Sequence, residues 1–200
     1  MKTELKTSIL KRIKSNNLKA FSCYDFTDLS SYKTISKCLQ RLENEKVIER
    51  VIAGIYCLNS YDKVLKIKVL PSIDDVIHAI ARKHNWIICP TGATALNAIG
   101  LSTQVAVAHT YLSNGPYKEY IIYDNKVNLK RTMNREIGGY SPITNLLIQC
   151  IKAIGEGNIE QNQIDYLRNK LSQEDKRTVV NETTLIQTWI RKTVLEICEH

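Results

Sequence analysis

A basic, polar helix face is the feature of the sequence with the clearest chemical potential. Apolar residues recur at helical spacing from the turn at Ser30 to about Asn44, which predicts an amphipathic helix. The opposite face has no carboxylate before Glu43. It carries Lys33, Ser36, Lys37 and Gln40, with Thr34 and Arg41 at its margins.

Side chains of these types reach base edges and phosphates when a helix enters the major groove of duplex DNA. The six residues are therefore candidate DNA-binding residues. The alternative is an ordinary solvated helix face, although such a face usually includes Glu or Asp that pairs with the lysines.

Two shorter segments before this helix predict the elements that hold it. Apolar residues at helical spacing predict a first helix over residues 5–13, and it ends in a polar turn at residues 15–17. A short extended piece follows, after which Asp25 can cap a brief second helix over residues 26–29. The candidate DNA-binding helix is then the third in the chain.

A hairpin is predicted directly after the third helix. Residues 47–51 and 55–58 are rich in β-forming side chains, and Gly54 in the connection can adopt positive φ. Three helices followed by a hairpin is the order of a winged helix-turn-helix, so this fold is expected over residues 1–60. The hairpin would bring Arg50 beside the DNA backbone, with Tyr56 supporting it.

Charge is distributed unevenly along the chain. Of the net charge of +8, residues 1–70 contribute +7, residues 71–140 contribute +2 and residues 141–200 contribute −1. Clustered Lys and Arg favour a polyanion because they displace counterions from phosphates. The excess therefore favours duplex DNA as partner of the N-terminal part, although surplus lysine also keeps proteins soluble.

The remaining chain is expected to form a central α+β unit over residues 61–140 and a helical part over residues 141–200, packed on it. The overall class is thus α+β. Residues 63–70 could be a strand or an extended linker. Helices are predicted over residues 73–83 and 91–99, with strands at 86–89, 104–112, 117–123 and 127–132. Three helices are predicted in the last part: from Pro142 to Gly155, from near Asn158 to Leu171, and from about Glu182 to the end.

No residues with a catalytic or cofactor-binding pattern are found. Asp74, Asp75, His78 and His84 lack a further ligand at a metal-binding interval, so a solvated helix face is expected there. Residues 91–94 lack the Gly-Lys-Ser/Thr ending of a phosphate loop. We therefore expect neither an enzyme nor a metal or cofactor site.

The cysteines and the hydropathy pattern indicate the state of the thiols and the location of the protein. The six cysteines occur singly and mostly among apolar residues, which predicts free, buried thiols. The N-terminal stretch lacks the apolar core of a signal peptide, and no apolar run is long enough to cross a membrane. A cytoplasmic protein without a membrane partner is expected.

Several motifs resemble AbiEi-type antitoxins and their uncharacterised winged-helix relatives. In the N-terminal part they are Tyr24-Asp25-Phe26, Ile35-Ser36-Lys37-Cys38-Leu39-Gln40-Arg41-Leu42, Val47-Ile48-Glu49-Arg50 and Gly54-Ile55-Tyr56. Further along they are Pro90-Thr91-Gly92-Ala93, Ala95-Leu96-Asn97, Gly100-Leu101-Ser102-Thr103-Gln104-Val105 and Trp189-Ile190-Arg191. One departure is Asn44-Glu45-Lys46, where the resemblance leads us to expect a glycine.

The resemblance implies an antitoxin-like transcriptional autorepressor of a bacterial toxin–antitoxin or phage-defence module. Such a protein binds inverted repeats in its own promoter and counteracts a nucleotidyltransferase-like toxin, directly or functionally. One alternative is a winged-helix regulator without a toxin, in which residues 71–200 sense a ligand or mediate dimerisation. A nucleic-acid enzyme is a further alternative, but it needs clustered acidic ligands that the sequence does not supply.

Overall fold

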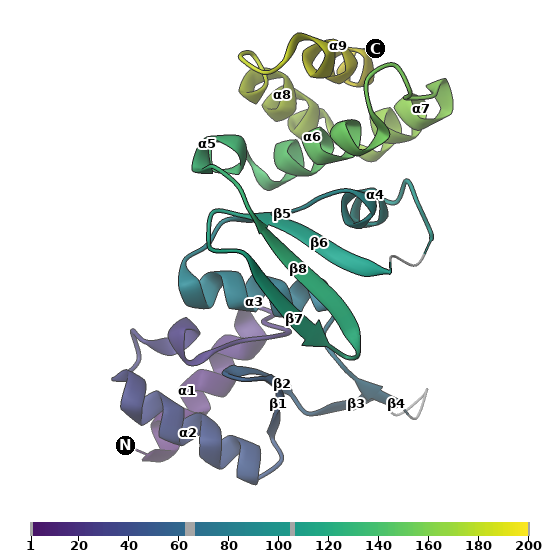
Figure 1. The fold of residues 1–200 in the computed structure, drawn as a ribbon. Helices are drawn as coiled ribbons and strands as arrows, with labels where there is room; N and C mark the ends of the chain where they lie inside the picture. Colours follow the sequence, from purple (N-terminus) through teal and green to yellow (C-terminus); the bar gives the residue numbers. More distant parts are fainter. Residues whose placement is uncertain (1, 63–66, 105–106, 200) are drawn as a thin grey trace. The chain divides into compact units, whose positions relative to one another are not determined.

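The computed structural model describes residues 2–62, 67–104 and 107–199. They form two compact units, which we call unit 1 (Met1–Trp86) and unit 2 (Ile87–His200). Figure 1 shows helices and small sheets in both, so the predicted α+β class is confirmed.

Unit 1 begins with two α-helices separated by a short 3-10 helix. These are α1 (Lys2–Ser15), η1 (Cys23–Phe26) and α2 (Tyr32–Asn44), and the side chain of Ser31 caps α2. The predicted first and third helices are confirmed. Their apolar faces meet in one core, whose fully buried members include Ile9, Ile13, Phe21, Phe26, Ile35, Leu39 and Leu42.

The short helix between them differs from the prediction. It was expected over residues 26–29 with Asp25 as its cap, but it occupies Cys23–Phe26 and is capped by Ser22. Asp25 is instead the third residue of a capping box, in which its carboxylate accepts a hydrogen bond from the Ser22 backbone N–H at 2.7 Å. Both residues are good caps by type, and the reciprocal bonds place Ser22 first.

Two hairpins follow α2. Strands β1 (Ile48–Ile52) and β2 (Ile55–Leu58) pair antiparallel around Ala53 and Gly54, and Gly54 has φ +77°. This confirms the predicted hairpin and the need for glycine in its turn. Strands β3 (Ser60–Asp62) and β4 (Ile67–Val69) form the second hairpin. Within the predicted strand or linker at 63–70, residues 63–66 lie outside the described residues.

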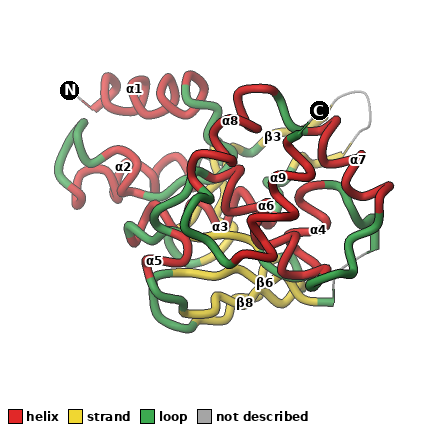
Figure 2. Tube along the Cα trace, turned by 90° about the horizontal axis from the view of Figure 1, so that it is seen from above, coloured by secondary structure: helices red, strands yellow, loops and turns green. Residues whose placement is uncertain are grey.

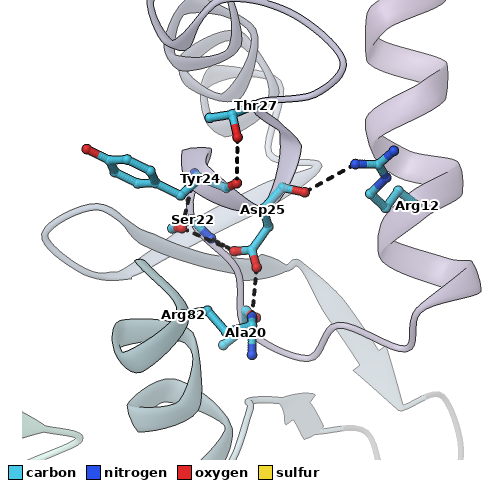
Figure 3. Close-up of polar contacts among 7 residues, drawn as sticks. All are labelled: Arg12, Ala20, Ser22, Tyr24, Asp25, Thr27 and Arg82. Carbon is cyan, nitrogen blue, oxygen red and sulfur yellow. Dashed lines mark hydrogen bonds and ion pairs between the residues drawn. The ribbon is translucent and has the colours of Figure 1, made fainter. Parts of the chain in front are cut away.

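Helix α3 (Ile73–His84) belongs to unit 1, whereas the sequence interpretation placed a boundary near residue 60. Its Arg82 donates from Nε to Asp25 at 2.7 Å and from Nη2 to the Ala20 carbonyl at 2.8 Å (Figure 3). These bonds join residues about sixty positions apart, so the local sequence pattern carries no signal for them.

Unit 2 contains a mixed four-stranded sheet. Its strands are β5 (Ile88–Pro90), β6 (Ala108–Ser113), β7 (Lys118–Ile122) and β8 (Asn125–Arg131), in the order β5-β6-β8-β7. Strands β6 and β8 are parallel, and the other pairs are antiparallel. Helix α4 (Ala93–Ile99) lies between β5 and β6 in the chain. Of the predicted strand at 104–112, residues 105–106 lie outside the described residues.

The C-terminal part of unit 2 is helical, as predicted, but its helices differ from the expected three. A short α5 (Asn134–Ile137) precedes α6 (Pro142–Ile154), α7 (Gln161–Lys170), α8 (Gln173–Glu182) and α9 (Thr188–Cys198). Helix α6 contacts α4, α8 and α9 (Figure 2).

The prediction missed α8 and began the last helix too early, at Glu182. A capping box of Ser172 and Asp175 starts α8, and Glu182 is its last residue. Helix α8 buries only Lys176 and Val179, so its apolar periodicity is weak.

Glu182 also stabilises the start of α6. Its carboxylate accepts hydrogen bonds from the Ser141 backbone N–H at 2.9 Å and from Ser141 Oγ at 2.8 Å. Burial raises the pKa of Glu182, but hydrogen bonds from Thr144 and Ser141 outweigh burial and hold the pKa below its ordinary value. The ionised carboxylate is therefore the form that the folded state favours.

The first prediction concerns Asp25, whose side chain is only 8% exposed. Asp25→Ala should lower the free energy of unfolding by about 2–3 kcal/mol, because it leaves Arg82 and the Ser22 N–H without a charged acceptor. Urea unfolding followed by circular dichroism measures this. The matched control is Asp28→Ala, which removes an exposed ion pair with Arg12 and should change little. Equal losses in the two variants would contradict the role given to Asp25.

The second prediction concerns pH. Glu182→Gln should destabilise the protein by about 1 kcal/mol near pH 7, because a charged acceptor becomes neutral. A lowered folded-state pKa stabilises above the unfolded value of 4.5, and this stabilisation disappears as pH falls through the folded pKa. The difference between the two proteins should therefore vanish in strong acid. Urea unfolding at several pH values tests it, and a difference independent of pH would refute it.

Candidate nucleic-acid interface

The polar face of α2 has the geometry that the sequence predicts. The side chains of Lys33, Thr34, Ser36, Lys37, Gln40 and Arg41 are all exposed. The opposite face of the helix, which includes Ile35, Leu39 and Leu42, is buried in the core of unit 1. The fold therefore presents all six candidate residues to solvent from one rigid helix.

The cations on this face are not neutralised by neighbouring carboxylates. Within the part of the chain that the structure describes, no hydrogen bond or ion pair holds the side chains of Lys33, Lys37 and Arg41. Three of the carboxylates around α2 pair with other cations. These pairs are Asp28 with Arg12, Glu43 with Arg50, and Glu45 with Lys6. The positive charge of α2 therefore remains available to an external anion.

A groove of about 650 Å³ lies between α1 and α2. Its α1 side includes Glu4, Leu5 and Ser8, and its α2 side includes Lys33, Thr34, Lys37 and Arg41. Ser36 and Gln40 do not line it. The six candidates thus divide into four that line the groove, three of them cationic, and an uncharged pair outside it.

Arg50 and Tyr56, the two candidates on the hairpin, are arranged differently. Arg50 Nη2 lies 3.1 Å from Glu43 Oε2 and 3.4 Å from the Tyr56 hydroxyl. Its guanidinium lies 5.5 Å from the centre of the Tyr56 ring. Tyr56 is only 8% exposed and belongs to the core. Arg50 of β1 therefore connects Tyr56 of β2 to Glu43 of α2, and its charge is shared with Glu43.

Lys46 stands in the segment where the resemblance led us to expect glycine, and it has φ +57°. Such a conformation is uncommon for residues other than glycine. The Lys46 carbonyl accepts a hydrogen bond from Asn59 Nδ2 at 2.9 Å, and the Val47 N–H donates to the Leu42 carbonyl at 2.9 Å. These bonds turn the chain from α2 into β1 without a glycine.

Sequence reasoning missed two tyrosines beside this face. Tyr24 of η1 and Tyr32, the first residue of α2, have ring centres 5.3 Å apart. Each residue is 51% exposed. The sequence shows only that the two aromatic residues lie on either side of the polar turn before α2. Their contact with each other depends on the fold.

The structure also describes the residues weighed for metal binding and catalysis. No group of three or more His, Cys, Asp or Glu side chains capable of holding a metal occurs among the described residues. Asp74 Oδ2 and His78 Nε2 lie 3.5 Å apart on one exposed face of α3. All six cysteines are free, and burial raises the pKa of Cys89 and Cys150 to about 12. None of the described helices is long and apolar enough to cross a membrane.

The observed architecture is an α+β protein whose N-terminal unit exposes a cationic helix face. Residues 8–179 match the model of a family of unknown function, DUF6088, so the chain belongs to that family. The matched region includes all of α2 and reaches into α8. A comparison with curated proteins found no match.

Proposed function

We propose that this protein binds duplex DNA through a winged helix formed by α1, η1, α2 and the β1–β2 hairpin. The observation that carries the proposal is the exposed face of α2, where Lys33, Lys37 and Arg41 have no ion pair to another described residue. A face with three such cations and no carboxylate suits a polyanion with closely spaced phosphates.

The same face supports a division of roles on DNA. Lys33, Lys37 and Arg41 neutralise phosphates, while Ser36 and Gln40 are short and long uncharged side chains that can hydrogen-bond to base edges in the major groove. Thr34 lies at the margin. The β1–β2 hairpin follows α2 in the chain, as the wing follows the DNA-reading helix in winged-helix proteins.

Composition agrees with assigning DNA binding to unit 1. Residues 1–86 carry 16 Lys and Arg against 9 Asp and Glu, whereas residues 87–200 carry 12 against 11. Unit 2 therefore has little electrostatic attraction for nucleic acid. We assign it a separate task.

The resemblance to AbiEi-type antitoxins suggests what that task is. We propose a cytoplasmic autorepressor of its own promoter that also counteracts a nucleotidyltransferase-like toxin, with unit 2 acting on the toxin directly or functionally. Support for this step comes from the motifs at residues 90–105 and 189–191, which lie in unit 2. Repression and antitoxicity would then depend on different parts of the chain.

The third prediction tests DNA binding. Lys37→Glu and Arg41→Glu should each weaken binding to a duplex from the protein's own promoter by about ten-fold or more, because a phosphate contact becomes a repulsion. Each should also reduce the dependence of log affinity on log salt by about one ion. Fluorescence anisotropy over a range of KCl concentrations measures both quantities.

The control for the third prediction is Lys152→Glu. It changes the net charge equally, but Lys152 is an exposed residue of α6 in unit 2. An equal loss in this control would mean that net charge, not the α2 face, governs binding. Unchanged affinity of both α2 variants for DNA would refute the assignment of α2 to the major groove.

The fourth prediction tests the second task. Co-expression with the product of the adjacent gene should restore growth, and Lys37→Glu should restore it equally, since the substitution leaves unit 2 intact. Reporter transcription from the protein's own promoter should rise in that variant because repression is lost. An adjacent product without toxicity, or toxicity unrelieved by the full chain, would refute the antitoxin role and leave DNA binding as a separate question.

A further inference from the structure

Tyr24 and Tyr32 form an exposed aromatic pair next to the cationic face of α2. Each residue is 51% exposed, and the two rings are tilted by 52° at a centre-to-centre distance of 5.3 Å. Tyrosine combines a large apolar ring with a polar tip, and it is enriched on surfaces that bind partners. The pair is therefore suited to contact a partner that is both polar and bulky.

The backbone that carries Tyr24 is held from several sides. Its N–H donates to Ser22 Oγ at 3.2 Å, and its carbonyl accepts from Thr27 Oγ1 at 3.2 Å. The next residue, Asp25, is bound to Ser22 and to Arg82. In Figure 3 the Tyr24 ring points away from this network. Because the network fixes the backbone, little ordering is needed when the ring meets a ligand.

The two hydroxyl groups have different surroundings. That of Tyr32 lies beside the Cys23 thiol, and this neighbour together with burial raises the pKa of Tyr32. No hydrogen bond joins the Tyr24 hydroxyl to another residue that the structure describes. Tyr24 is therefore the member of the pair whose hydroxyl is available, and Tyr32 is the member that supports the ring.

Charge around the pair favours an anionic partner. Tyr32 is followed by Lys33, and no carboxylate occurs between residues 29 and 42. The nearest acidic residues in sequence, Asp25 and Asp28, are paired with Arg82 and Arg12. A negatively charged oxygen near Tyr24 would therefore meet cations and a hydroxyl donor without an opposing free carboxylate.

We propose that the Tyr24 hydroxyl donates a hydrogen bond to a phosphate oxygen of the DNA strand that borders the major groove occupied by α2. Tyr32 is then a positioning residue for the Tyr24 ring. This inference rests on the proposed function. Tyrosine is one of the side chains that bind phosphate oxygens in protein–DNA interfaces, where such contacts fix the orientation of the protein on the duplex.

A neutral donor leaves a different thermodynamic signature from a lysine. It displaces no condensed counterion, so its loss leaves the salt dependence of binding unchanged. It also contacts no base, so its loss reduces affinity by the same factor on every sequence. Both features separate Tyr24 from the cations of α2.

The fifth prediction uses Tyr24→Phe, which removes only the hydroxyl. Affinity for duplex DNA should fall by about three- to ten-fold, as expected for one net hydrogen bond. The loss should be equal on the protein's own promoter and on a scrambled duplex, with the salt dependence of the wild type. Tyr32→Ala should produce a comparable loss, and Tyr24→Phe should then add little to it, because both act through one contact.

The control is Tyr117→Phe, an equivalent change of an exposed tyrosine in unit 2 that should leave affinity unchanged. Circular dichroism and urea unfolding establish that each variant is folded. If the wild type binds DNA and Lys37→Glu weakens it while Tyr24→Phe does not, the Tyr24 contact is wrong and the proposed function stands. A Tyr24→Phe effect that alters the salt dependence or is confined to one sequence also overturns it. Failure of the wild type to bind any duplex would refute both proposals.

Discussion

The buried carboxylate of Asp25 joins parts of unit 1 that are far apart in the sequence. It closes the capping box of η1 with Ser22, and it receives Arg82 from α3, which also binds the Ala20 carbonyl. Next to this point, Phe21 and Tyr56 exchange two backbone hydrogen bonds of 2.8 Å. A carboxylate shielded from water is costly unless it has such hydrogen-bonding partners. The position of η1 relative to α3 therefore depends on this one group, and so does the platform that presents Tyr24.

The basic surface of α2 results from how the fold distributes its acidic side chains. Five described carboxylates of unit 1 are paired with cations from other elements: Asp25 with Arg82, Asp28 with Arg12, Glu43 with Arg50, Glu45 with Lys6 and Glu49 with Lys68. Apart from the pair of the shielded Asp25, these pairs are exposed and contribute little to stability. Their effect is on the surface potential, because these five acidic groups are already bound to other cations and offset the α2 cations less. A modest excess of Lys and Arg in the sequence thereby becomes a local concentration of positive charge.

The sequence predicted those parts of unit 1 whose signals are local. Helical spacing specifies α1 and α2, Gly54 specifies the first hairpin, and the exposed face of α2 follows directly from the helical wheel. The start of η1 was mispredicted because Ser22 and Asp25 are equally good caps, and the choice depends on reciprocal bonds. Helix α8 was missed because it buries too few apolar residues to show a period. The link from Arg82 to Asp25 and the pairing of Tyr24 with Tyr32 arise from tertiary contacts, so composition and spacing could not reveal them.

Arg50 shows why residue type alone does not decide which cations can meet a ligand. By sequence, Arg50 and Lys37 are both basic residues of the segment that we propose to bind DNA. In the structure, Lys37 has no ion pair to another described residue, whereas Arg50 shares its charge with Glu43 and lies against Tyr56. A phosphate that approached Arg50 would compete with Glu43 and be repelled by it. Its attraction to the hairpin is therefore weaker than its attraction to α2. An orienting contact beside α2 has correspondingly more value if it does not depend on charge, and the neutral hydroxyl that we propose for Tyr24 meets that requirement.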